Sequence, residues 1–339
     1  MHNVRRVPTS EVSTSVLEGR KEQERQQLAL YKDLEDAYLE KRRHNELTTD
    51  ALESTTALLT LNPEYYSAWN FRREILQHLF RQADEAEQDS IRTQLLAEDI
   101  TMTQQSMRTH PKVYWLWNHR RWCLHALPNP DKSLESGQKK WRKELALVDM
   151  MLDMDPRNFM GWNYRRFVIA ELAAAMVPGQ RTPFPVFLSA DSLKLEEKHS
   201  ALQLAEDELQ YTLHKIESNF SNFSAWHYRS KLLPRVWDAK QLGESDRAKE
   251  RDQEFELLQQ AMYTDPNDQS IWIYHSWLMS QAPSQQLLCD QIHVIEELAE
   301  LEPDSKCTQR NSHRVSSKFG RVQTAVVVAP EPYFRDEQA

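Results

Sequence analysis

The sequence predicts an all-α protein built as a right-handed superhelix of helical hairpins, an α-α solenoid. Two observations favour this fold class. The chain has 339 residues but only 6 glycines, far below the roughly 7% of average usage, so few tight hairpin turns are available. In addition, one tryptophan-centred pattern recurs five times, at an interval typical of stacked helical repeats.

The recurring pattern reads Pro-x-x-aromatic-x-x-Trp-x-x-Arg-Arg in its fullest form, as in "DPRNFMGWNYRRF" at 155–167. Its tryptophans are Trp69, Trp117, Trp162, Trp226 and Trp272. Successive tryptophans are 48, 45, 64 and 46 residues apart, so the interval of 64 requires an insertion. The segment 176–192, rich in Pro and Ser, is predicted to be that insertion and to form a surface loop.

Each repeat is expected to contain two helices. The segment 138–152 shows apolar residues at helical spacing, and the Asp-Pro pair at 155–156 ends it, because proline disfavours the α conformation in the residue before it. A second helix then carries Trp162, with Arg165 and Ile169 on the same face. One hairpin cannot bury its apolar face alone, so successive hairpins must stack to form the core.

The repeated tryptophans and arginines are interpreted mainly as scaffolding, because an active site needs its residues once. A tryptophan at the same place in every hairpin is expected to anchor the packing of neighbouring hairpins. The paired arginines at 72–73, 120–121 and 165–166 are expected to stack on aromatic rings or to pair with acidic residues of the next repeat.

Composition excludes several classes of function. The net charge of −9 argues against a general nucleic-acid binder. No apolar run is long enough for a membrane span, and the basic N-terminus lacks the apolar segment of a signal peptide. The cysteines Cys123, Cys289 and Cys307 form no C-x-x-C pair, so we expect a reducing, cytoplasmic location and no metal or cofactor on this chain alone.

The repeat resembles that of protein prenyltransferase α subunits, which are shared by farnesyltransferase and the two geranylgeranyltransferases. The segments 219–234 and 265–278, and the opening Met1-His2, are most similar to the Rab-type (type II) enzyme. The resemblance covers about residues 1–305. It implies an N-terminal segment and first helix at 1–47 and a repeat domain at 48–305.

The resemblance also implies a function. An α subunit of this type is inactive alone and forms an obligate heterodimer with a β subunit that bears zinc. Together they transfer geranylgeranyl from geranylgeranyl diphosphate to C-terminal cysteines of Rab GTPases, which an escort protein presents. Magnesium is a second metal to consider, as a companion of the diphosphate. Two alternatives stay open: the α subunit of farnesyltransferase and geranylgeranyltransferase I, and a non-catalytic helical-repeat scaffold.

Three residues are candidates for the chemistry. By the resemblance, Arg157 in "DPRNF" is the cation that stabilises the diphosphate leaving group, and arginine rather than lysine there marks the Rab type. Lys112 takes the matching position in the second repeat. His2 could reach the zinc of the partner subunit. For each, the alternative is a solvated residue without a role.

The resemblance fails at residues 306–339. This segment loses the apolar period and is basic up to residue 330, so it is expected to be a disordered tail. An altered gene model is the alternative explanation for the abrupt change. Either way, the final hairpin that would cap the solenoid is expected to be missing.

Overall fold

The computed structural model describes residues 13–84, 87–128, 133–177, 194–281 and 285–312. Within these ranges the only regular secondary structure is helical, which confirms the predicted all-α class. The helices are α1 (Thr14–Arg43), α2 (Thr49–Leu61), α3 (Tyr66–Gln82), α4 (Gln88–Thr109), α5 (Tyr114–Ala126), α6 (Leu134–Met154), α7 (Phe159–Met176), α8 (Leu195–Ser218), α9 (Phe223–Ala239), α10 (Glu244–Thr264), α11 (Gln269–Leu278) and α12 (Gln285–Leu301). None of them is long and apolar enough to span a membrane.

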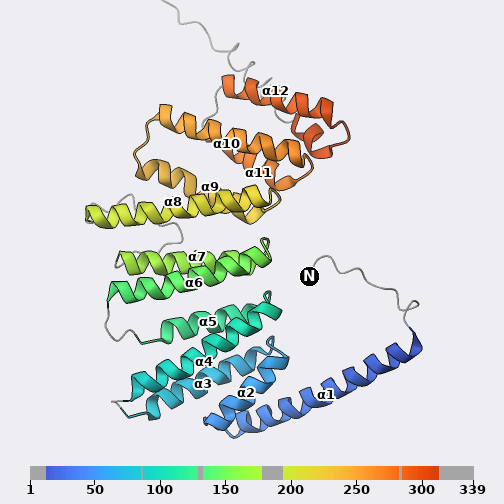
Figure 1. The fold of residues 1–339 in the computed structure, drawn as a ribbon, viewed down its shortest axis with the longest axis vertical. Coiled ribbons are helices and arrows are strands. Elements are labelled where there is room, and N and C mark those ends of the chain that lie inside the picture. The colour runs from blue at the N-terminus through green and yellow to red at the C-terminus, as the bar shows by residue number, and fades with distance from the viewer. Residues whose placement is uncertain (1–12, 85–86, 129–132, 178–193, 282–284, 313–339) are drawn as a thin grey trace, which may run out of the picture. The chain divides into compact units, whose positions relative to one another are not determined.

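The helices pack as sequential hairpins within two compact units, one of residues 1–133 and one of residues 134–339. In the first unit α2 pairs with α3 and α4 with α5; in the second, α6 pairs with α7, α8 with α9 and α10 with α11 (Figure 1). Each hairpin is one predicted repeat, with the tryptophan on its second helix. The prediction of stacked hairpins is therefore confirmed, whereas the right-handed superhelix stays a prediction.

The turn inside each hairpin contains a proline, except in the fourth repeat, where Phe220 takes its place. In the third, fourth and fifth repeats a polar side chain also caps the second helix. In the third repeat, the side chain of Asn158 accepts hydrogen bonds from the backbone N–H groups of Met160 and Gly161, at 3.0 and 3.4 Å, and so begins α7. The helices of this hairpin approach closely here, since a Cβ atom on Gly161 would lie 2.9 Å from Leu152 Cδ2. A larger residue at Gly161 would therefore displace the Leu152 side chain, so packing, and not an unusual backbone angle, favours glycine here.

The five repeat tryptophans are buried, and each is held in the same way. The indole N–H donates to the backbone carbonyl six residues earlier, at 2.8 to 2.9 Å. In three cases the ring also contacts the residue two positions after the next tryptophan: Trp69 meets His119, Trp162 meets Tyr228 and Trp226 meets Tyr274. Each indole thus closes its own turn, and these three also pack against the following repeat.

Two predicted boundaries can be compared with the structure. Helix α1 lies inside the predicted N-terminal segment 1–47. Of the predicted loop 176–192, Met176 is the last residue of α7 and Val177 is buried, and the remainder lies outside the described residues. The expected single repeat domain 48–305 is divided between the two units.

The predicted disordered tail begins too early. Residues 306–312 are helical, and they follow a turn at Pro303 in the register of a sixth repeat. Gln309 stands six residues after Pro303, as each tryptophan stands after its turn, and its amide donates to the Pro303 carbonyl at 3.5 Å. Polar Thr308 and Asn311 are buried here, which explains why an apolar period failed to reveal the helix. Residues 313–339 lie outside the described residues.

Candidate functional site

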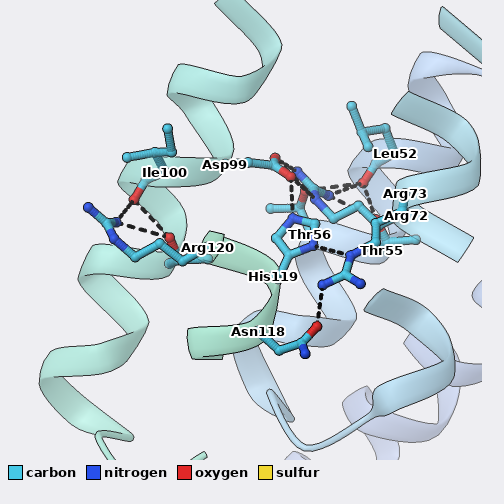
Figure 2. Close-up of polar contacts among 11 residues, drawn as sticks. Leu52, Thr55, Thr56, Arg72, Arg73, Asp99, Ile100, Asn118, His119 and Arg120 are labelled. Carbon is cyan, nitrogen blue, oxygen red and sulfur yellow. Dashed lines mark hydrogen bonds and ion pairs between the residues drawn. The ribbon is translucent and has the colours of Figure 1, made fainter. Parts of the chain in front are cut away.

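Two kinds of site stand out among the described residues: buried polar joints between repeats, and an exposed face of the second helices. In the first unit, the joint centres on Asp99 of α4 (Figure 2). Arg72 of α3 donates to both carboxylate oxygens of Asp99, with Nε 3.0 and 3.1 Å away. His119 of α5 lies with Nε2 2.7 Å from the same carboxylate. The acid thus connects the second helix of one repeat to both helices of the next.

The same arrangement recurs in the second unit. Glu208 accepts hydrogen bonds from Arg165 of the preceding repeat, whose Nε lies 2.9 Å away, and it bonds Tyr228 of its own repeat. Glu254 accepts from Arg229 and from the Tyr274 hydroxyl, the latter at 2.6 Å. In every joint the acid precedes a tryptophan by 18 residues, and the arginine follows the previous tryptophan by three.

In three repeats the arginine three residues after the tryptophan therefore has a structural role. Arg72, Arg165 and Arg229 are buried, and each also contacts the first helix of its own hairpin. Arg72 and Arg229 do so through a backbone carbonyl and a threonine hydroxyl, and Arg165 through the Asp149 carboxylate. The predicted pairing with an acid of the next repeat is confirmed for Arg72 and Arg165, and Arg229 makes the same contact.

One joint contains the right atoms for a metal site but does not fit one. Ligand atoms of Asp99, His119 and Cys123 lie within 4.8 Å of one another, and all three residues are buried. However, both oxygens of Asp99 accept from Arg72. Burial raises the pKa of the Cys123 thiol well above its ordinary value, so the thiolate that a metal requires is disfavoured. The ligand atoms of Asp99 and His119 are thus already engaged in hydrogen bonds.

His119 is neutral and its tautomer is fixed by its neighbours. Arg73 Nε donates to His119 Nδ1 at 3.2 Å, so Nε2 carries the ring proton and donates to Asp99. Burial lowers the pKa of His119 to about 4. Burial alone would raise the pKa of Asp99, but hydrogen bonds from His119 and Arg72 outweigh it and hold that pKa below its ordinary value.

These shifts predict an acid-sensitive joint. Because the folded pKa of His119 is depressed, its contribution to stability is complete above the unfolded pKa of about 6.5 and is lost as pH falls toward 4. Between pH 7 and pH 4 the free energy of unfolding of the wild type should fall by about 3 kcal/mol more than that of His119→Gln. Glutamine keeps a hydrogen-bond donor but does not titrate. Urea unfolding of both proteins at these two pH values measures the difference. Equal losses would contradict the prediction.

The exposed face of the second helices repeats as regularly as the joints. It comprises the residues three before, one after and four after each tryptophan. We call this set the helix-B face; in the first four repeats it is Tyr66, Asn70, Arg73, Tyr114, Asn118, Arg121, Phe159, Asn163, Arg166, Phe223, His227 and Ser230. The aromatic residues at its start are 46% to 62% exposed, which is unusual for large apolar side chains unless another protein covers them.

The predicted site residues lie at the turns beside this face. Arg157 is exposed in the turn before α7, its backbone N–H donates to Asp155 Oδ1 at 3.2 Å, and its guanidinium contacts no partner among the described residues. Lys112 is exposed at the matching turn of the second repeat. His2 lies outside the described residues. The sequence reasoning missed the joint acids, although their constant 18-residue distance from the next tryptophan could have revealed them.

Comparison with known proteins gives this geometry a family. The model of the "Protein prenyltransferase alpha subunit repeat" matches residues 48–79, 96–127, 141–172, 205–236 and 251–282. The geranylgeranyl transferase type-2 subunit alpha of Candida albicans is 30% identical over 336 residues, which cover 89% of this chain and 82% of that protein. The chain belongs to the protein prenyltransferase α-subunit family. Within this family its similarity is to type-2 geranylgeranyl transferase α subunits.

Two further relatives qualify this assignment. The rat protein of the same name is 36% identical over 332 residues, which are 97% of this chain but 50% of that protein. The chain thus spans about half the length of the mammalian relatives it matches. Among solved structures, Candida albicans protein geranylgeranyltransferase-I complexed with GGPP matches with a TM-score of 0.52 and 18% identity over 87% of both chains. That likeness supports the family fold alone.

Proposed function

We propose that this chain is the α subunit of a heterodimeric Rab geranylgeranyltransferase, which transfers geranylgeranyl from geranylgeranyl diphosphate to C-terminal cysteines of Rab GTPases. The observation that carries the proposal is the similarity to a type-2 α subunit over most of its length. The zinc-bearing β subunit, the Rab escort protein and a cytoplasmic location belong to the same proposal.

The proposed reaction forms a bond between the substrate cysteine sulfur and C1 of the isoprenoid while the bond from C1 to the diphosphate oxygen breaks. Zinc in the β subunit would hold the sulfur as a thiolate, and magnesium is a candidate companion of the diphosphate. The described residues of this chain offer no fitting metal site. The contribution left for the chain is to bind the partner and to place a cation near the departing diphosphate.

Arg157 is the residue that we propose for this cation. Its side chain is exposed and unpaired among the described residues, so it is available to a ligand in the partner subunit. It stands one residue before the cap of α7, where the partial positive charge of the helix N-terminus adds to its own charge. Its planar guanidinium can donate to two phosphate oxygens at once.

Replacing Arg157 by alanine should therefore slow transfer more than it weakens assembly. Loss of one such donor costs on the order of 2–4 kcal/mol of transition-state stabilisation, so kcat should fall roughly 30- to 1,000-fold. The assay uses the chain co-purified with a prenyltransferase β subunit, geranylgeranyl diphosphate and a Rab with its escort protein. Arg157→Lys should retain part of the activity. Lys112→Ala, at the matching turn, should lower kcat by less than about tenfold.

The same co-purification discriminates the alternatives. Transfer of the C20 isoprenoid to a Rab supports the proposal. Stable pairing with a farnesyl-type β subunit, and transfer to its substrates instead, would assign the chain to farnesyltransferase and geranylgeranyltransferase I. Pairing with no β subunit would leave the non-catalytic scaffold as the remaining function. If Arg157→Ala left kcat unchanged in an active heterodimer, the role of Arg157 would be refuted while the assignment survived.

A further inference from the structure

In the first and third repeats the second arginine of the pair, Arg73 or Arg166, differs from the first in having no carboxylate partner among the described residues. We propose that Arg73 and Arg166 are anchoring cations of the helix-B face, each of which binds a carboxylate of the partner subunit. This inference rests on the proposed function, because it requires that the chain assemble with a partner protein.

Arg73 is half-buried on α3 and is held by neutral groups only. Its Nε–H donates to His119 Nδ1 at 3.2 Å and its Nη2 donates to Asn118 Oδ1 at 2.6 Å. The guanidinium carbon lies 5.5 Å from the centroid of the Trp122 ring. Burial lowers the pKa of Arg73, and no carboxylate counteracts this effect. The side chain is thus oriented by the joint behind it while its positive charge stays uncompensated (Figure 2).

Arg166 on α7 is in the same condition in the second unit. It is half-buried, and it has no hydrogen bond or ion pair within the described part of the chain. Burial again lowers its pKa, and the only opposing influence comes from the neutral hydroxyl of Tyr228. The imidazole of His227, on the neighbouring α9, lies close enough for Arg166 to disfavour its protonation. A proton on His227 would thus be repelled by Arg166, and no carboxylate among the described residues offsets the charge of Arg166.

The contrast with the neighbouring arginines shows that this arrangement is selective. One position earlier on each helix, Arg72 and Arg165 bind Asp99 and Glu208. A partly desolvated cation without an anion is costly, and proteins ordinarily pair it. In the first and third repeats the described residues provide a carboxylate for the inward arginine and none for Arg73 or Arg166, and we infer that the partner subunit supplies the anion.

A protein carboxylate fits better than a small anion. Each cation shares its helix face with an exposed aromatic ring two turns earlier, Tyr66 for Arg73 and Phe159 for Arg166. Tyr, Phe and Arg together are the composition of the buried centre of protein interfaces. The guanidinium fork suits bidentate binding of a carboxylate. The partner surface is therefore expected to present Asp or Glu opposite both positions.

Charge-reversal variants test this inference. Arg73→Glu and Arg166→Glu in the full chain are titrated with the separately purified β subunit, and the dissociation constant is measured by isothermal calorimetry. Each should weaken association by at least about 30-fold, because a partner carboxylate would then face a like charge. Arg73→Gln and Arg166→Gln, which only remove the charge, should weaken it less. Circular dichroism confirms that each variant is folded.

Two exposed residues of first helices provide matched controls, Arg108→Glu on α4 and Lys143→Glu on α6. These should change the dissociation constant less than about threefold, since rim charges contribute little to affinity. Reversal of the facing Asp or Glu of the β subunit to Lys should restore binding to Arg73→Glu or Arg166→Glu. Variants that bind as tightly as the controls would overturn this inference alone. A wild-type chain that binds no prenyltransferase β subunit would overturn the proposed function and this inference with it.

Discussion

Replacing Arg165 by alanine is expected to lower the free energy of unfolding of the isolated chain by about 3–5 kcal/mol. The arginine is 2% exposed and connects three helices through Asp149 and Glu208, and its guanidinium carbon lies 3.3 Å from the centroid of the Tyr211 ring. Its removal leaves the buried Glu208 carboxylate with only the Tyr228 hydroxyl as a partner. An uncompensated buried charge costs more than the pair contributes. Urea unfolding followed by circular dichroism measures the loss.

The neighbouring arginine provides the control. Arg166→Ala, one residue along the same helix, removes a side chain of the same length that has no partner in the described chain, so it should cost less than about 1 kcal/mol. The comparison separates the joint from general effects of shortening an arginine on α7. If the two variants were equally destabilised, the joint would not be a source of stability.

Replacing Trp226 by alanine is expected to cost a similar amount, about 3–5 kcal/mol, for a different reason. The ring is 1% exposed and packs on Tyr274 of the next repeat with centroids 4.6 Å apart. Alanine would leave a cavity at the contact between two hairpins and would also free the Phe220 carbonyl, which the indole N–H reaches at 2.8 Å. The same unfolding experiment measures the effect.

Trp226→Phe divides this cost into its parts. Phenylalanine keeps most of the apolar contact with Tyr274 but cannot donate to the Phe220 carbonyl, so it should cost only about 1–2 kcal/mol. A loss as large as that of alanine would mean that the turn hydrogen bond, and not the packing between repeats, is the main role of the residue.

The hairpins could be predicted from sequence because their signals are local. Each turn and the tryptophan six residues after its proline lie close together in the sequence. Alignment on the tryptophan therefore located all five hairpins, including the fourth, where Phe220 takes the place of the proline. The pairing of inward arginines with acids was predicted only in kind. The particular acid lies 25 to 43 residues away in the described joints, so it emerges only after several repeats are superposed on their tryptophans.

The sixth repeat was missed because its signal is polar. Gln309 takes the place of the tryptophan, and its amide donates to the Pro303 carbonyl as an indole does in the other repeats. His275 and Gln291 take the places of the arginine and the acid of a joint, and His275 Nε2 lies 3.0 Å from Gln291 Oε1. A search for apolar period and charge pairs finds nothing there. The role of Arg157 could not be derived from its surroundings in this chain. An exposed arginine in a turn is compatible with many roles, and its function depends on the ligand or partner that it contacts.

The contact between His275 and Gln291 affects the local unfolding of the chain. Asp99, Glu208 and Glu254 join repeats through ion pairs. Unfolding one hairpin would leave a buried charge of its neighbour without a partner, which is costly, so neighbouring hairpins are expected to unfold together. The contact between His275 and Gln291 contains no carboxylate, so water can replace it at less cost than it can replace an ion pair. Amide protons of residues 302–312 should therefore exchange with solvent rapidly, through small local unfolding events. Amide protons of α9 and α10 should exchange slowly, because they require cooperative unfolding of more than one hairpin. Residues 302–312 can thus detach and re-form without disturbing the neighbouring hairpins.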